Sequence, residues 1–329
     1  MAEPNHEPLD DGGDFRGSRT GKRQSWFGLK RHVKRLMGAP IPHAVLRTVV
    51  GAVPRLRSGR LPAPNGLGEV TGIVGDTTFV MVRPDRCENA KDLYWGQGRR
   101  TRAEDVLSLE VVARLAVDAD VFLDIGSYTG LFTLATTAVD PQLRAHAFDI
   151  VPSVVATLKA NLERNGVSDR VEVHEEGVGT PGTTMRVPVA EGGSSLPSFY
   201  SSRMHFDDGV SIEFRSLDSM IGSLPADARV VMKIDVEGTE DRIFRDGQDF
   251  LGRFRPDMLC EVLQGVADVE ALQELLAPHG FSVYLVRERD LRWAPRIQPD
   301  EGFRDWLITP KDPETLASMG FTVSGRADR

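Results

Sequence analysis

The stretch VFLDIGSYTG, residues 121–130, decides the fold of this chain. Its opening residues favour a buried strand, and the strand ends on a carboxylate, Asp124. Gly126 and Gly130 then form a turn with small residues at its key points, and residues 130–138 predict a helix. A strand, a glycine turn and a helix in this order are typical of open α/β sheets, which bind ligands at the carboxyl ends of their strands.

The turn reads Asp-x-Gly-x-x-x-Gly, which differs from the Gly-x-Gly-x-x-Gly pattern of dinucleotide sites. Tyr128 occupies the position of the middle glycine, which would let a pyrophosphate approach the backbone. A carboxylate at Asp124 would repel a pyrophosphate and would pair with an ammonium group. The turn therefore predicts a ligand that carries a positive charge.

Strand-like and helix-like segments alternate along most of the chain. Strands are expected at residues 120–124, 144–149, 170–175, 229–235, 257–263 and 280–287. Helices are expected at residues 130–138, 152–165, 239–246 and 268–278, with one more at 103–116. This alternation predicts a parallel, doubly wound sheet. Residues 69–83 predict a β-hairpin that turns at Gly75 and Asp76 and precedes the sheet.

The second expected strand of the sheet ends on another acid, Asp149. An acid at this place in a doubly wound sheet accepts hydrogen bonds from ribose hydroxyls. An amino-acid group beside the glycine turn and a ribose at Asp149 together outline S-adenosylmethionine. We therefore predict contacts of this cofactor with Asp124, Gly126, Tyr128, Gly130 and Asp149, and with Glu176, which would accept a hydrogen bond from the adenine.

The fourth expected strand delivers the sequence KIDVEG to the same edge of the sheet. Its acids, Asp235 and Glu237, are two residues apart and would share a face in extended chain. We interpret them as groups that bind the substrate or remove its proton. We assign no metal; the alternative is a divalent cation held by Asp235 and Glu261. A strand end that only forms an ion pair, with Lys233 or Arg242, remains a third interpretation.

Residues 178–217 form an insertion that is rich in glycine and serine. Its composition suits a lid that closes over the substrate, and equally a plain surface excursion. His205 lies within it and is our candidate for a mobile catalytic base.

The N-terminal part of the chain has an uneven charge. Residues 16–60 carry twelve Lys and Arg and no acid, whereas the whole chain has a formal net charge of −8. Residues 1–24 are expected to be disordered, and residues 25–65 to form a basic amphipathic helical arm. The arm would either pack on the acidic body or contact a membrane surface or a partner. No signal peptide, membrane span or disulfide framework is expected, so the predicted compartment is the cytoplasm.

Several segments resemble the FkbM-type methyltransferases, which depend on S-adenosylmethionine. FLDIGSYTGLFT resembles their first motif, and AFDIVPSVVATLKANLERNG, with Asn161 and Asn165, resembles their second strand and helix. VMKIDVEGTEDRIFRDG, RPDMLCEVL and the GGSSL of residues 192–196 also match. The resemblance covers residues 118–265, and it departs at Tyr128, where the family has Asn, and at Asp149-Ile150, where the family has Glu-Pro.

The resemblance implies an α/β, doubly wound, Rossmann-like sheet of the class I methyltransferase type. We place this domain at residues 66–310, followed by a C-terminal tail at 311–329. The implied activity is O-methylation of a hydroxyl on a small molecule, a sugar or a natural-product intermediate, without nucleic acid as a partner. One rival is an NAD-type oxidoreductase on the same fold; another is a non-catalytic module that docks to a membrane or partner.

Overall fold

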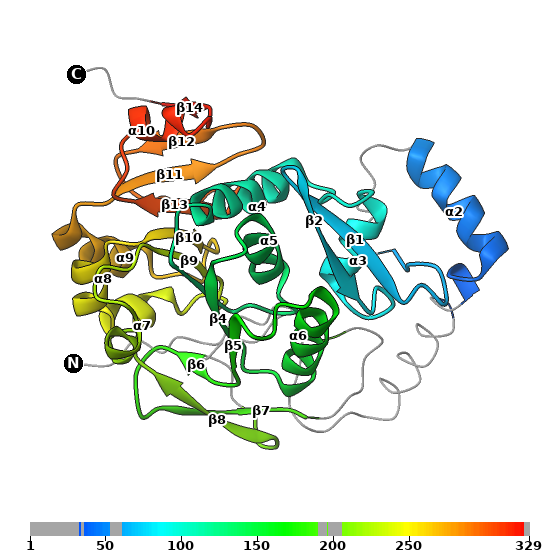
Figure 1. Ribbon diagram of the computed structural model, residues 1–329, viewed down its shortest axis with the longest axis horizontal. Helices are drawn as coiled ribbons and strands as arrows, with labels where there is room; N and C mark the ends of the chain where they lie inside the picture. Colours follow the sequence, from blue (N-terminus) through cyan, green and yellow to red (C-terminus); the bar gives the residue numbers. More distant parts are fainter. Residues whose placement is uncertain (1–32, 34–35, 53–60, 190–195, 197–205, 326–329) are drawn as a thin grey trace.

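The computed structural model describes residues 33, 36–52, 61–189, 196 and 206–325. These residues build an α/β structure around one large sheet (Figure 1). The hairpin β1 (Glu69–Val74) and β2 (Thr77–Val82) lies with the helix α2 (Pro40–Ala52) at one end of the molecule. The last strands lie at the opposite end. The predicted 1–24 segment, residues 25–32, 34–35 and 53–60 of the predicted basic arm, and His205 lie outside the described residues.

The large sheet has nine strands in the order β14-β12-β11-β13-β10-β9-β3-β4-β5. Its strands are β3 (Val121–Ile125), β4 (Arg144–Phe148), β5 (Val171–His174), β9 (Val230–Ile234), β10 (Asp257–Glu261), β11 (Ser282–Val286), β12 (Leu291–Ala294), β13 (Asp305–Thr309) and β14 (Val323–Ser324). The neighbours from β5 to β10 are all parallel, as predicted. Beyond β10 the sheet is mixed, because β13 is antiparallel to both β10 and β11, and this strand was not predicted.

Helices cover both faces of the sheet, which makes it doubly wound. One face packs against α4 (Ala103–Ala116), α5 (Leu131–Val139) and α6 (Pro152–Asn165). The other packs against α7 (Glu240–Arg245), α8 (Gln248–Phe254) and α9 (Val269–Leu276). The side chains of β3 show how the core divides: Phe122 packs on the first face, and Leu123 and Ile125 on the second.

The remaining elements are short. A helix α3 (Glu88–Trp95) follows the hairpin, and 3-10 turns occur at Asp218–Ser223 and Ala277–His279. The insertion contains β6 (Gly177–Val178), β7 (Thr184–Val187) and β8 (Val210–Arg215), which form a separate three-stranded sheet. The helix α10 (Pro313–Ser318) buries Leu316 completely, and β14 pairs with β12. The chain thus continues into the sheet beyond residue 310, so the expected tail at 311–329 needs correction over residues 311–325.

Two asparagine side chains of α6 join the hairpin to this helix. The Val82 N–H donates to Asn161 Oδ1 at 2.7 Å, and the Val80 N–H donates to Asn165 Oδ1 at 2.8 Å. Asn161 Nδ2 also donates to the carbonyl of Thr129, in the glycine turn, at 2.8 Å. Helix α6 therefore connects the hairpin to the turn that decided the fold.

Helix α2 touches the body through His43, whose Nε2 lies 2.8 Å from Tyr94 Oη on α3. Pro40 begins this helix, since a proline fits the first turn, where its missing N–H costs nothing. No helix among the described residues is both long and apolar enough to span a bilayer.

Candidate active site

The glycine turn ties the ends of β3 and β4 together. The N–H groups of Gly126 and Ser127 both donate to the carbonyl of Phe148, at 3.0 and 2.9 Å. Gly126 has φ +76°, and a Cβ built on it would lie 1.8 Å from the carbonyl oxygen of Asp235. Only glycine permits this approach, so the turn of β3 sits directly against the end of β9.

Asp149 closes the same turn from the tip of β4. Its Oδ2 accepts the N–H of Tyr128 at 2.9 Å, and its Oδ1 accepts the N–H of Val151 at 2.9 Å. Tyr128 has φ +49°, which is uncommon for a residue with a side chain. Burial raises the pKa of Asp149 to about 7. Asp124, Gly126, Tyr128 and Asp149 thus lie around the same turn, and their contacts with a cofactor stay a prediction.

Asp124 lies deeper than its predicted role suggests. Its side chain is fully buried, and its Oδ2 accepts the N–H and the hydroxyl of Thr133 at 3.1 and 2.6 Å. Burial raises the pKa of this carboxyl. Among the described residues, Asp124 Oδ1 and the nearby Ser127 Oγ are buried and have no hydrogen-bond partner. Buried polar atoms without partners are costly, and a ligand in the turn would satisfy them.

The end of β9 adds a buried lysine to the turn. Lys233 Nζ lies 2.8 Å from Asp235 Oδ2 and donates to the carbonyl of Gly126 at 3.1 Å. The Asp235 N–H in turn donates to the carbonyl of Ile125 at 3.0 Å. One interpretation of this strand end was an ion pair with Lys233 or Arg242, and the structure contains the pair of Asp235 with Lys233. Although burial opposes ionisation, Lys233 lowers the pKa of Asp235, so this carboxylate is ionised.

Two further acids lie beside Asp235. One ligand oxygen from each of Asp235, Glu237 and Glu261 lies within 4.8 Å of the others, which is a spacing that could hold a divalent cation. Glu237 is half-buried, with φ +57°, and burial followed by the nearby Asp235 raises its pKa to about 8. Burial and Asp235 also raise the pKa of Glu261 well above its ordinary value. Of these two neighbouring carboxyls, Asp235 is therefore the one that ionises more readily.

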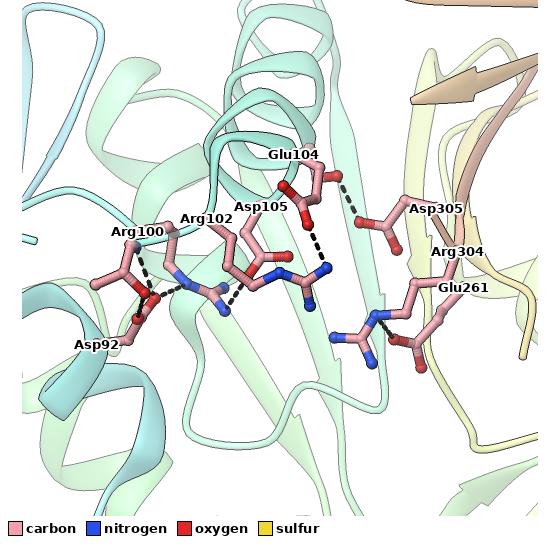
Figure 2. A network of polar contacts seen from close by, with 10 residues as sticks. Asp92, Arg100, Arg102, Glu104, Asp105, Glu261, Arg304 and Asp305 are labelled. Carbon is pink, nitrogen blue, oxygen red and sulfur yellow. Dashed lines mark hydrogen bonds and ion pairs between the residues drawn. The ribbon is translucent and has the colours of Figure 1, made fainter. Parts of the chain in front are cut away.

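A network of charged side chains extends from Glu261, one acid of this cluster, towards α3 and α4 (Figure 2). Arg304 Nε lies 2.9 Å from Glu261 Oε1, and the neighbouring Asp305 accepts a hydrogen bond from Ser108 of α4. Further along, Arg100 Nη2 lies 3.0 Å from Asp105 Oδ2, and Arg100 Nε bonds Asp92. The network links α3 and α4 to the ends of β10 and β13.

Arg304 and Ser108 were not predicted from the sequence. Their partners lie 43 and 197 residues away along the chain, so no local spacing indicated them. The apolar run of residues 306–308 was the available signal, because a strand there pairs Asp305 with Glu261 in register.

Gly130 and Glu176, the other residues predicted to contact the cofactor, make different contacts. Gly130 is buried, and a Cβ on it would lie 2.4 Å from Leu158 Cδ1, so its role is to let α6 pack closely. Glu176 follows β5, and its Oε1 lies 3.1 Å from Arg215 Nη1 and 3.3 Å from His174 Nδ1. Residues 190–195 and 197–205 of the insertion, with His205, lie outside the described residues.

Comparisons with known proteins agree with this arrangement. Residues 124–283 match the model of the methyltransferase FkbM domain. Methyltransferase 1 of Beauveria bassiana is 26% identical, over 54% of this chain and 77% of that protein. The ribosomal protein L11 methyltransferase of Bacillus velezensis is 26% identical over 30% of this chain and 31% of its own length. The crystal structure of methyltransferase FkbM from Methylobacillus flagellatus KT aligns with a TM-score of 0.41 and 19% identity, over 58% of this chain and 44% of that one.

The sheet order, the helices on both faces and the matched segment define an α/β methyltransferase with a Rossmann-like, class I fold. The matched segment, residues 124–283, includes the glycine turn and the acids of β9 and β10, so the part of the chain that resembles the methyltransferase FkbM domain contains the candidate site.

Proposed function

We propose that this chain is an S-adenosylmethionine-dependent O-methyltransferase, and that its acceptor is a hydroxyl of a small molecule, a sugar or a natural-product intermediate. One observation carries the proposal: the glycine turn joins Asp149, at the tip of β4, to the acids at the tip of β9. A ribose-bearing methyl donor and a hydroxyl acceptor need these two sets of groups side by side.

The residues of the turn fit the cofactor. Asp149 is held by two backbone N–H groups and keeps lone pairs for ribose hydroxyls, since each carboxylate oxygen accepts more than one hydrogen bond. Among the described residues, Asp124 Oδ1 is buried without a hydrogen-bond partner, and the ammonium group of a cofactor bound in the turn would satisfy it. The bound cofactor would supply an activated methyl group on its sulfonium.

Among the acids of the site, Glu237 is the best proton acceptor. An effective general base has a pKa near the operating pH, and the pKa of Glu237 is raised to about 8. Asp235 is a weaker base, because its ion pair with Lys233 stabilises the charged form. We therefore assign proton removal from the acceptor hydroxyl to Glu237. Asp235 and Lys233 hold the tip of β9 against the turn, which positions the acceptor.

An assay with hydroxylated acceptors tests this function. The full chain would be incubated with S-adenosylmethionine and a panel of sugars and polyketide-like alcohols, and the products would be identified by mass and by the chemical shift of the new methyl group. The proposal predicts an O-methyl product and one equivalent of S-adenosylhomocysteine. A methyl group found on nitrogen or carbon, with the same panel offering those atoms, would overturn the assignment of O-methylation.

We also propose that the basic arm contacts a membrane surface or a partner. Leu36, Ile41 and Val45 are exposed by 67%, 80% and 60%, and residues 16–60 carry twelve Lys and Arg and no acid. Deletion of residues 1–60 should remove co-sedimentation with anionic vesicles and leave cofactor binding intact. Co-sedimentation that survives the deletion would refute this role.

A further inference from the structure

Two histidines and a glutamate meet on one face of the sheet edge formed by β4 and β5. The strands are parallel, and their register sets His146 beside Glu172. His174 lies two residues beyond Glu172, so its side chain emerges on the same face. This His146–Glu172–His174 cluster is separate from the acids of β9 and β10.

The cluster has distances that suit metal ligands. His146 Nδ1 lies 3.1 Å from His174 Nε2, and the two Glu172 oxygens lie 3.5 Å from His146 Nδ1 and 3.7 Å from His174 Nε2. Metal–nitrogen and metal–oxygen bonds to zinc are about 2.0–2.2 Å long, which places neighbouring ligand atoms of a tetrahedral site about 3.3–3.5 Å apart. The three groups therefore surround a position that an ion could occupy with little movement of the side chains.

A second layer of contacts orients His174. Glu176 Oε1 lies 3.3 Å from His174 Nδ1, and Arg215 holds Glu176 at 3.1 Å. A ligating histidine that donates its other ring N–H to a carboxylate is a common feature of metal sites, because the contact fixes the tautomer and leaves Nε2 as the donor to the ion. The ring of Phe148 stacks on His174, with centroids 4.3 Å apart and planes 9° from parallel.

One ligand of the cluster is open to solvent. Glu172 is 67% exposed at its side chain, so an ion can reach the cluster from solvent without opening the fold.

We propose that His146 Nδ1, His174 Nε2 and the Glu172 carboxylate bind a divalent transition-metal ion, for which Zn²⁺ is the best match. Two imidazoles and a carboxylate form a zinc ligand set, and a fourth position remains for water. The ion stabilises the edge of the sheet. The carbonyl of His174 accepts the N–H of Asp149 at 3.2 Å, so the same ion also steadies the strand end that supports the glycine turn.

Calorimetry with Zn²⁺ alone tests the site on tag-free, chelator-treated full-length protein. Wild type should bind one ion at this site, and His174→Ala and Glu172→Gln should each weaken binding at least about tenfold. Glu176→Gln should weaken it by about 10- to 100-fold, as loss of an orienting partner does. His279→Ala is the matched control: this half-buried histidine bonds Gln248, and its loss should leave zinc affinity unchanged.

Two variants distinguish zinc binding at this cluster from a folding defect and from binding elsewhere. Glu172 is an exposed side chain, so Glu172→Gln tests the site even where His174→Ala fails to fold. Asp235→Asn alters the other cluster that could hold a cation and should leave zinc binding at the histidines unchanged. No zinc binding by wild type would overturn the proposal. So would equal zinc affinity in wild type and Glu172→Gln, or loss of zinc in Asp235→Asn alone.

Discussion

Substitution of Gly126 by alanine tests the contact that joins the turn of β3 to the end of β9. The added Cβ would lie 1.8 Å from the Asp235 carbonyl oxygen, whereas real Cβ atoms essentially never approach another heavy atom closer than 3.0 Å. The backbone must therefore separate by more than an ångström. Forcing alanine to φ +76° costs about 1–2 kcal/mol, and the overlap adds about 1–3 kcal/mol. Gly126→Ala should lower the free energy of unfolding by about 2–5 kcal/mol.

Gly166→Ala is the matched control for this substitution. Gly166 ends α6 at φ +67°, and a Cβ on it meets nothing within 4 Å. Only the cost of the left-handed backbone, about 1–2 kcal/mol, should appear. Urea unfolding of both variants, followed by circular dichroism, isolates the overlap as the difference between them. The affinity for S-adenosylmethionine should fall in Gly126→Ala and hold in Gly166→Ala. Equal loss of stability in the two variants would refute the close approach.

Three further predictions concern Glu237, Glu240 and Asn161. The kcat/KM of wild type should rise with pH through about 8, because Glu237 must lose its proton to act as base. Glu237→Gln should lose about 10²–10⁴-fold in turnover. Initial rates with an identified acceptor check both predictions, and a flat pH profile in wild type argues against this base. Burial raises the pKa of Glu240 from 4.5 to about 7, so its neutral form stabilises the fold at low pH and that contribution is lost as pH rises to about 7. Glu240→Gln should therefore gain about 2.5 kcal/mol over wild type between pH ~5 and pH ~8 in urea titrations, and a gain that does not change with pH contradicts the shift. Asn161→Ala leaves the Val82 N–H and the Thr129 carbonyl without their partner and should cost about 2–4 kcal/mol, whereas a loss below about 0.5 kcal/mol would mean that water replaces both contacts.

Local pattern was sufficient for the centre of the fold. Strands β3, β4, β5, β9 and β10 were predicted within a residue or two, because each is an apolar run that ends at a turn or an acid. The antiparallel strand β13 was missed, since its run of residues 305–309 follows a long irregular segment and lacks a helix that would mark a parallel crossover.

The candidate site was also predictable only in part. The neighbourhood of Asp149, the glycine turn and Asp235 followed from one rule, that parallel strands bring their carboxyl ends to one edge of the sheet. This rule does not say how deeply a side chain is buried. Asp124 was predicted to face the ligand, and the structure buries its side chain completely, with its carboxylate bonded to Thr133. Burial of a single carboxyl depends on the packing of α5, which no spacing in the sequence reports.

Calorimetry of S-adenosylmethionine and NAD on wild type and Asp149→Asn tests the central claim most directly. The substitution keeps the size of the side chain and removes its charge and one acceptor. We expect wild type to bind S-adenosylmethionine and its demethylated product in preference to NAD, and Asp149→Asn to bind them at least about tenfold more weakly, or about 1.4 kcal/mol. Preferential binding of NAD, or an affinity for S-adenosylmethionine that Asp149→Asn leaves unchanged, would contradict the placement of the cofactor at the joined tips of β3 and β4.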